Sequence, residues 1–186
     1  DEAVAAAERF GYPVVLKATA DGLGHKSDIG GVRLGLYAAD AVRRAHREIA
    51  AELRSRALPG AGTLVQPQRE GGVELLVGVL RDPSWGPVLD IGLGGVWVEV
   101  LGDSVLRLLP ADAAEVRDAL GELRGAGLLA GARGTEPADL DRLSEVIARI
   151  GDMAVSLGTG LGELEVNPLL VRGSRVEALD ALVVWH

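Results

Sequence analysis

Groups suited to phosphate chemistry lie close together near the start of the sequence. Only two of the 19 basic residues are lysines, Lys17 and Lys26, and His25 and four glycines lie in the same stretch of chain. Glycines let a backbone approach a ligand and turn its amide groups inward, and a lysine ammonium is a compact point charge. We interpret residues 20–31 as a phosphate-facing loop. The alternatives are that two exposed cations are there by chance and that His25 is an ordinary surface residue.

Oxygen-bearing side chains form a second group near the end of the sequence. Alternation along a strand puts Glu163, Glu165 and Asn167 on one face. A following antiparallel strand can return Asp180, thirteen residues beyond Asn167, to the same place. Such oxygen ligands suit Mg²⁺, which takes one or two protein oxygens together with substrate phosphates. We therefore predict a metal site here, although Asn167 before Pro168 is also compatible with a simple turn.

A glycine-rich segment at 92–95 separates two apolar runs at 87–91 and 96–100. These glycines either turn a hairpin or let the backbone approach a ligand, and the segment by itself favours neither reading. The two common phosphate-loop motifs, GxGxxG and GxxxxGK followed by Ser or Thr, are absent. A phosphate site in this chain must therefore use another architecture.

Composition limits the class of protein. The 186 residues are 48% apolar and 25% charged, which suffices for a folded core and excludes a disordered chain. A net charge of -8 argues against nucleic-acid binding. The chain has no cysteine, so disulfides, thiolate metal sites and thiol nucleophiles are excluded. No apolar run approaches the roughly 20 residues of a membrane span, and no signal peptide opens the chain, so we expect a soluble cytoplasmic protein.

The order of elements favours an α+β fold with an antiparallel sheet, because short strands cluster in hairpin-like steps instead of alternating strictly with helices. Asp40 and Asp139 are placed to cap helices. Helices are expected at 1–10, 41–56, 112–123 and 139–157, and strands at 12–17, 32–36, 63–66, 73–80, 87–91, 96–100, 104–109, 162–166, 169–171 and 175–184.

Six segments between Gly11 and Val183 carry a resemblance to a known family: GYPVVLK, HKSDIGGVRLGL, GGVELLVGVLRDPSWGPVL, GLGGVWVEVLGD, LEVNPLLV and ALDALV. Through these segments the sequence resembles the ATP-grasp domain of acyl-CoA synthetases that form nucleoside diphosphates, above all the ADP-forming acetate–CoA ligases. It is also similar to the synthetase-like part of fused protein acetyltransferases, and its last matching segment resembles succinyl-CoA synthetase. It departs from the family pattern in two places: ADGLG precedes His25 where a Ser-Pro pair is frequent, and Asp90 stands where an apolar residue is common.

The resemblance implies an ATP-grasp fold of two α+β lobes with mainly antiparallel sheets, residues 1–66 and residues 67–186, which hold a nucleotide between them. Family domains start some tens of residues earlier. We therefore expect the N-terminal part of the first lobe to be missing from this chain.

The resemblance also implies roles for individual residues. Lys17 would bind the nucleotide phosphates, and His25 would receive or deliver the phosphoryl group. Asn167 and Asp180 would hold Mg²⁺. The further nucleotide-binding candidates are Lys26, the adenine-contact segment Val65, Gln66, Pro67 and Gln68, then Glu74, Gly94, Gly95, and Glu99, which would help to orient the metal or the phosphates.

The implied function is that of an enzyme, an acid–thiol ligase that joins an acid to CoA while ATP becomes ADP and phosphate through phosphohistidine. ATP or ADP and Mg²⁺ would be its cofactors. Its partners would be the CoA-binding and ligase domains or subunit of the same synthetase, or a fused acetyltransferase domain, with no nucleic acid and no membrane. Two alternatives stay open: a nucleotide-binding regulatory domain of a fused protein acetyltransferase, and an ATP-grasp ligase that joins a carboxylate to an amine. The motif HKSD weighs against the amine ligase, because a direct ligase needs no relay histidine.

Overall fold

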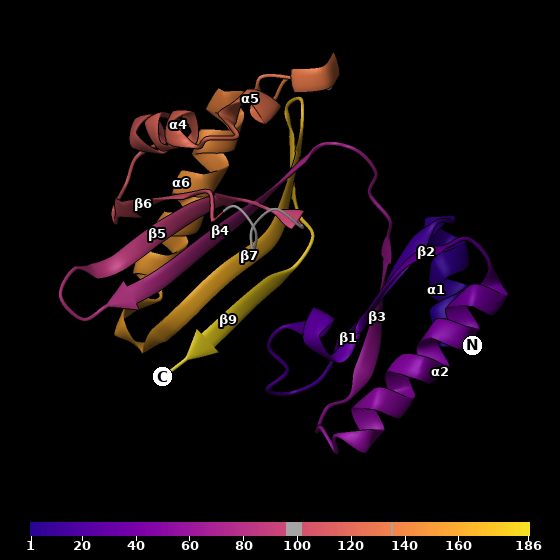
Figure 1. The fold of residues 1–186 in the computed structure, drawn as a ribbon. Coiled ribbons are helices and arrows are strands. Elements are labelled where there is room, and N and C mark those ends of the chain that lie inside the picture. Colours follow the sequence, from indigo (N-terminus) through magenta and orange to yellow (C-terminus); the bar gives the residue numbers. More distant parts are fainter. Residues whose placement is uncertain (96–101, 135) are drawn as a thin grey trace. The chain divides into compact units, whose positions relative to one another are not determined.

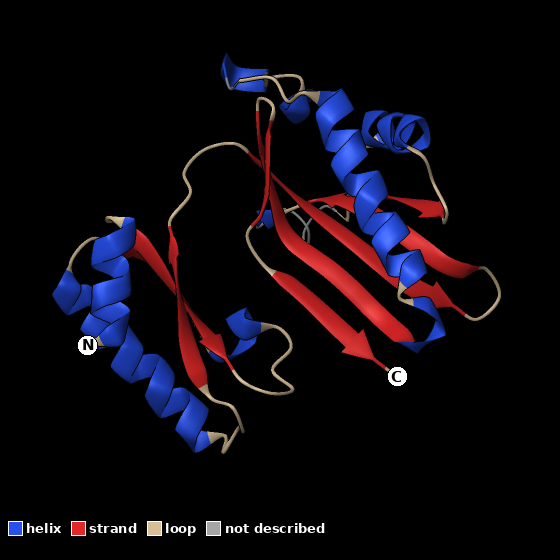
Figure 2. Cartoon of the chain, turned by 180° about the vertical axis from the view of Figure 1, so that it is seen from behind, coloured by secondary structure: helices blue, strands red, loops and turns tan. Residues whose placement is uncertain are grey.

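The structure, a computed structural model, describes residues 1–95, 102–134 and 136–186, which divide into two compact units, residues 1–70 and residues 71–186. Each unit is an antiparallel β-sheet with helices packed on one face (Figures 1 and 2). The α+β class with antiparallel sheets is therefore confirmed. The units divide after Glu70, whereas the sequence places the boundary after Gln66.

Unit 1 is a three-stranded sheet with two helices on one face. Its elements are α1 (Glu2–Phe10), β1 (Val14–Thr19), the 3₁₀ helix η1 (Lys26–Ile29), β2 (Val32–Leu36), α2 (Ala39–Ser55) and β3 (Gly62–Pro67). Strand β1 is central in the order β2-β1-β3. Its alternate residues Val14, Leu16 and Ala18 belong to the core shared with the helices. The intervening residues, Lys17 among them, therefore lie on the open face of the sheet.

Unit 2 is a six-stranded sheet with its helices on one face (Figure 2). Its elements are β4 (Val73–Asp82), β5 (Gly86–Leu93), β6 (Ser104–Leu108), α4 (Ala113–Glu122), α5 (Ala126–Leu129), η3 (Ala132–Gly134), α6 (Leu140–Ser156), η4 (Gly158–Gly160), β7 (Leu161–Arg172), β8 (Arg175–Ala178) and β9 (Ala181–Trp185). The strand order is β6-β5-β4-β7-β8, and β9 pairs with β7. Leu75, Val77 and Val79 of β4 share a core with Leu143 and Ile147 of α6, so the residues between them in β4 lie on the open face.

The helix starts follow local sequence signals in unit 2 and depart from them in unit 1. Asp112 begins α4 with a capping box, and the Asp139 carboxylate caps α6 as predicted. The prediction that Asp40 caps α2 is wrong, because α2 begins at Ala39 and Asp40 lies in its first turn, paired with Arg43 at 2.8 Å. A carboxylate in the first turn still stabilises the helix through the macrodipole. Of the helices in the described residues, none has the length and apolar character needed to cross a membrane.

Two strand predictions near the C-terminus differ from the structure. The runs 162–166 and 169–171 form one strand, β7, whose pairing with β4 shifts register at the Asn167–Pro168 step. Proline has no N–H to donate to the ladder, so the strand accommodates it where the pairing is irregular. The run 175–184 is instead divided into β8 and β9, which both pair with β7. The strand expected at 96–100 lies outside the described residues.

Candidate functional site

Lys17 is a buried lysine on the open face of the unit 1 sheet. It lies in the central strand, opposite Val32 of β2 and Leu64 of β3, and is only 7% exposed. Its neighbours Leu16 and Ala18 belong to the helix-side core, so Lys17 leaves the sheet on the other face. Lysines are rarely buried to this extent. The position therefore marks Lys17 as a functional candidate and not as a residue of the apolar core.

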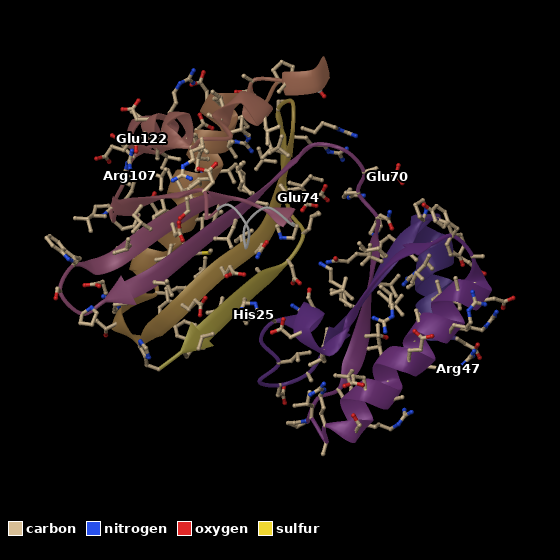
Figure 3. The ribbon with its side chains drawn as sticks, viewed as in Figure 1. His25, Arg47, Glu70, Glu74, Arg107 and Glu122 are labelled. Carbon is tan, nitrogen blue, oxygen red and sulfur yellow. The ribbon has the colours of Figure 1, made fainter. Side chains whose placement is uncertain are left out.

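The glycine-rich loop after β1 carries His25 on its exposed side (Figure 3). The second half of the loop folds into η1, and the N–H of Gly31 donates to the carbonyl of Lys26 at 2.8 Å. The N–H of Ala18 donates to the carbonyl of Gly31 at 2.6 Å, which joins the end of the loop to the residue after Lys17. His25 is thus exposed on a turn that is anchored to β1.

Two glycines of this loop have different surroundings. A Cβ atom on Gly31 would lie 2.8 Å from the Cβ of Ala18 and 2.8 Å from the carbonyl oxygen of Lys26. A Cβ atom on Gly24, the residue before His25, would meet nothing within 4 Å. Gly31 therefore permits the close packing of the loop on β1, whereas Gly24 leaves open space beside the histidine.

The predicted adenine-contact segment spans the end of β3. Val65 packs against the helix-side core, whereas Gln66, which is opposite Val15 in the register, lies on the same open face as Lys17. In the described residues β3 is an edge strand that ends at Pro67, so one row of its backbone groups is not used by the sheet. The segment therefore offers the Gln66 side chain and edge backbone groups, but not the Val65 side chain.

Gln68 has a structural role that the sequence did not indicate. Its Oε1 accepts the N–H of Gly35 at 2.6 Å, and its own N–H donates to the carbonyl of Pro13 at 3.0 Å. Gly35 has a positive φ of 67° and lies where the β1–β2 pairing shifts register. Gln68 thus fastens the chain after β3 to the residue before β1 and to β2, and its contact with adenine stays a prediction.

A cavity of about 810 Å³ lies beside β3 in unit 1, between this strand and residues of α1. His46 and Val65 line it, and Nδ1 of His46 is 3.0 Å from Oγ1 of Thr63. Lys17 and His25 are not among its lining residues. The residues predicted to act on phosphate therefore lie outside this cavity, on the open sheet face and in the loop.

In unit 2, Glu74 lies against the glycine-rich segment that follows β5 (Figure 3). The N–H of Gly94 donates to the Glu74 carbonyl at 2.6 Å, and a Cβ atom on Gly94 would lie 2.8 Å from the Glu74 backbone. A Cβ atom on Gly95 would lie 3.1 Å from Oε2 of Glu74. The structure brings these three candidates together, and close packing accounts for Gly94. Glu99, the fourth candidate here, lies outside the described residues.

The returning strand brings Asp180 beside Asn167, as the alternation predicted. The N–H of Asn167 donates to the carbonyl of Asp180 at 3.1 Å, and Val166 is opposite Ala181 in the β7–β9 register. Asp180 Oδ1 accepts the N–H of Ala181 at 3.0 Å, which orients the carboxylate. Two oxygen-bearing side chains are therefore adjacent at this point.

The side-chain oxygens of Asn167 and Asp180 fit Mg²⁺ better than a metal ion whose ligands must all come from the protein. In the part of the chain that the structure describes, no three His, Asp or Glu side chains group closely enough to hold a metal ion. Mg²⁺ commonly takes one or two protein oxygens and completes its shell with water and substrate phosphates. The pair Asn167 and Asp180 meets that requirement, and its metal binding stays a prediction.

Asp103 is a buried acid that sequence reasoning missed. It is 8% exposed, and its two carboxylate oxygens accept the N–H groups of Arg124 and Gly125, each at 2.9 Å. Its carbonyl accepts the N–H of Leu93 at 3.2 Å. Asp103 therefore fixes the end of β5, next to Gly94, to the turn after α4. In the sequence, Asp103 is recognisable only as an acidic residue between Gly102 and the predicted strand at 104–109.

The protein thus has two units with antiparallel sheets. One carries a buried lysine and a glycine-rich loop, and the other carries two adjacent oxygen-bearing side chains. The sequence profile of the ATP-grasp domain family matches residues 1–184, and the chain belongs to this family. Among curated proteins, it is 41% identical to a trans-feruloyl-CoA synthase from an unknown prokaryotic organism, over 99% of this chain and 26% of that protein. It is 33% identical to the beta subunit of ADP-forming acetate–CoA ligase I of Pyrococcus furiosus, over 99% of this chain and 80% of the subunit.

Among solved structures, those of an acetyl-coenzyme A synthetase match the whole chain. The dinucleotide-forming acetyl-coenzyme A synthetase 1 of Ca. Korarchaeum cryptofilum, in complex with coenzyme A and Ca-AMPCP, matches with a TM-score of 0.88 and 36% identity, over 100% of this chain and 81% of that chain. In another structure of that synthetase, with coenzyme A and Mg-AMPPCP, a phosphohistidine segment points towards the nucleotide-binding site. That structure matches with a TM-score of 0.81 and 34% identity, over 100% and 82% of the two chains. The chain spans about a quarter of the length of the first two curated relatives.

Proposed function

We propose that this chain is the nucleotide-binding, phosphoryl-transferring part of an acyl-CoA synthetase that converts acid, CoA and ATP to acyl-CoA, ADP and phosphate. The observation that carries the proposal is the arrangement in unit 1, where exposed His25 lies on a turn anchored to the strand of buried Lys17. Phosphoryl transfer depends on positioning and charge neutralisation more than on covalent help from many residues. Lys17 supplies a fixed charge, and His25 supplies a nitrogen that can accept a phosphoryl group.

Asn167 and Asp180 would hold Mg²⁺ in this proposal. When bound, the ion would neutralise charge on the nucleotide phosphates. The backbone hydrogen bond between the two residues keeps their side chains adjacent, and the bond from Ala181 orients the Asp180 carboxylate. These contacts belong to the protein alone and would be present before a nucleotide binds.

Two transfer steps at His25 would connect the partner phosphohistidine to ADP. A phosphohistidine on the partner part of the synthetase would give up its phosphoryl group as the N–P bond breaks and a new N–P bond forms at His25. That bond would then break as a terminal oxygen of ADP takes the phosphoryl group, which yields ATP and a neutral imidazole. The reverse sequence would consume ATP. The phosphohistidine segment of the Korarchaeum synthetase supports a donor that reaches the nucleotide site.

The acid and CoA sites would belong to other parts of the enzyme. The long single-chain relatives are about four times the length of this chain, and the Pyrococcus relative is a beta subunit. The CoA-binding and ligase domains, on the same polypeptide or on another subunit, would thus be the partners. Residues 1–186 alone are expected to make no acyl-CoA from acetate, ATP and CoA, and detection of that product would contradict the assignment.

The test of His25 is a phosphate label chase in the complete synthetase. With His25→Ala, labelled acyl phosphate should still label the partner histidine, while labelled ATP should not form from ADP. His46→Ala is the matched control, because His46 lies in α2, contacts Thr63 of β3 and should transfer label as the wild type does. If His25 only contacts the nucleotide, His25→Ala will raise KM and largely keep turnover at saturation. Transfer of label to ADP at a near wild-type rate in His25→Ala would show that His25 does not relay the phosphoryl group.

A further inference from the structure

A backbone hydrogen bond connects the glycine-rich segment of unit 2 to Asp103. The N–H of Leu93 donates to the Asp103 carbonyl at 3.2 Å, and the N–H of the next residue, Gly94, donates to the Glu74 carbonyl at 2.6 Å. Consecutive backbone groups make these two bonds, and the planar peptide unit between them leaves little freedom for one to move without the other. Whatever holds Asp103 in place therefore also holds Gly94 against Glu74.

The carboxylate of Asp103 fastens this residue to the turn after α4. One of its oxygens accepts the N–H of Arg124 and the other accepts the N–H of Gly125, each at 2.9 Å. Hydrogen bonds to an ionised oxygen are roughly twice as strong as neutral ones, and the use of both oxygens fixes the orientation of the carboxylate. Because only 8% of Asp103 is exposed, water competes little for these bonds. Asp103 is therefore a firm link between that turn and the glycine-rich segment.

Gly125 brings the same turn against the side chain of Leu93. A Cβ atom on Gly125 would overlap Cδ1 of Leu93 and would lie 3.3 Å from Oδ2 of Asp103. The φ of Gly125 is -89°, which any residue can adopt, so the close approach and not the backbone conformation requires glycine here. Leu93 is itself only 4% exposed and belongs to the core of unit 2. The turn therefore fixes Leu93 twice, through its side chain and through Asp103.

We propose that Asp103 is a positioning residue for nucleotide binding, which acts through the glycine-rich segment on the Glu74 side chain. Glu74 leaves the sheet on its open face, because its neighbour Leu75 belongs to the helix-side core. A Cβ atom on Gly95 would lie 3.1 Å from Oε2 of Glu74, so the segment that Asp103 holds also borders this carboxylate. Misplacement of a site by about 1 Å can cost about 100-fold in rate, so a residue that touches no ligand can control it. The inference rests on the proposed function, in which Glu74, Gly94 and Gly95 are nucleotide-binding candidates.

The experiment measures ATP formation by the complete synthetase from acyl-CoA and phosphate at varied ADP concentration, at a temperature where circular dichroism shows each variant folded. Asp103→Asn keeps the shape of the side chain, but its amide nitrogen cannot accept an N–H, so one of the two bonds to the turn is lost. We expect the KM for ADP to rise about tenfold or more while kcat is largely kept, because binding and not chemistry is weakened. Ile147→Val is the matched control: it removes one buried methyl group from the same core, so it should lower the melting temperature and leave the KM unchanged.

A pair of substitutions tests the same link from the side of the turn. In Gly125→Ala the added methyl group pushes on Leu93, so the KM for ADP should rise as it does in Asp103→Asn. Leu93→Val removes the atom that this methyl group would overlap, so the double variant should recover most of the wild-type KM. A wild-type KM in folded Asp103→Asn overturns the proposal, as does an equal rise of the KM in Ile147→Val. Absence of ATP formation in the wild-type synthetase would instead refute the proposed function itself.

Discussion

The two units share one plan but differ in charge. Each is an antiparallel sheet with helices on one face and an open face opposite. Residues 1–70 contain ten Lys or Arg and nine Asp or Glu, a net charge of +1, whereas residues 71–186 contain nine and eighteen, a net charge of -9. The lysines and His25 belong to the first unit, and the oxygen ligands to the second. The candidate phosphate-binding groups and the candidate metal ligands are therefore carried by separate compact units, so the proposed chemistry needs both.

Removing the buried cation of unit 1 should have the largest effect on binding. With Lys17→Met, we expect the Kd for ADP to rise about 100-fold, or about 2.8 kcal/mol, because a fixed charge near phosphate is lost. Methionine has a similar volume, so urea unfolding should show a folded variant in which the packing of β1 is kept. Calorimetric titration and urea unfolding measure the two quantities. An unchanged Kd would show that Lys17 does not contact the nucleotide.

Removing the predicted metal ligands of unit 2 should lower the affinity for ADP only when Mg²⁺ is present. With Asn167→Ala and Asp180→Ala together, we expect ADP affinity in Mg²⁺ to fall by about tenfold to fiftyfold, because each change deletes an oxygen ligand. In excess EDTA the variant and the wild type should bind ADP equally. Titrations in both conditions provide the comparison. A loss of affinity that is equal with and without Mg²⁺ would point to a structural effect instead.

Two glycines of the anchored loop in unit 1 should differ in how much their substitution lowers the free energy of unfolding. Gly31→Ala should lower the free energy of unfolding by about 1–3 kcal/mol, because its methyl group would be 2.8 Å from Ala18 and from the Lys26 carbonyl. Gly24→Ala, which meets nothing within 4 Å, should change it by less than about 0.5 kcal/mol. Urea unfolding monitored by circular dichroism measures both. Equal effects would mean that close packing on β1 does not hold the loop.

A surface ion pair of unit 2 should contribute least to the stability of the fold. Arg107 and Glu122 are 2.6 Å apart between β6 and α4, and the Glu122 side chain is 55% exposed (Figure 3). Because exposed pairs are screened by water and salt, Arg107→Ala should cost at most about 1 kcal/mol and less still in 0.5 M salt. Unfolding at two salt concentrations tests this. A larger, salt-independent loss would indicate that packing of the arginine stem matters more than its charge.

Patterns local in sequence predicted most of the fold, and contacts distant in sequence explain the rest. The alternation in Glu163–Asn167 and the strand that returns Asp180 were visible because they involve neighbouring strands. The bond from Gly35 to Gln68 was not, because it joins residues 33 positions apart in a register that periodicity does not give. The two amide bonds to Asp103 were hidden for the same reason. For Asp40, two adjacent candidate starts of one helix differ by too little for the sequence to separate them.

The most direct test of the central claim is calorimetric titration of residues 1–186 with ADP, once in Mg²⁺ and once in excess EDTA. The proposed division of groups predicts weak binding in Mg²⁺, with most of the affinity lost in EDTA because the oxygen ligands of unit 2 then have no metal to bind. Lys17→Met should abolish the binding that remains in EDTA. Tight binding that is indifferent to both EDTA and Lys17→Met would contradict the account, as would the absence of any nucleotide binding in Mg²⁺.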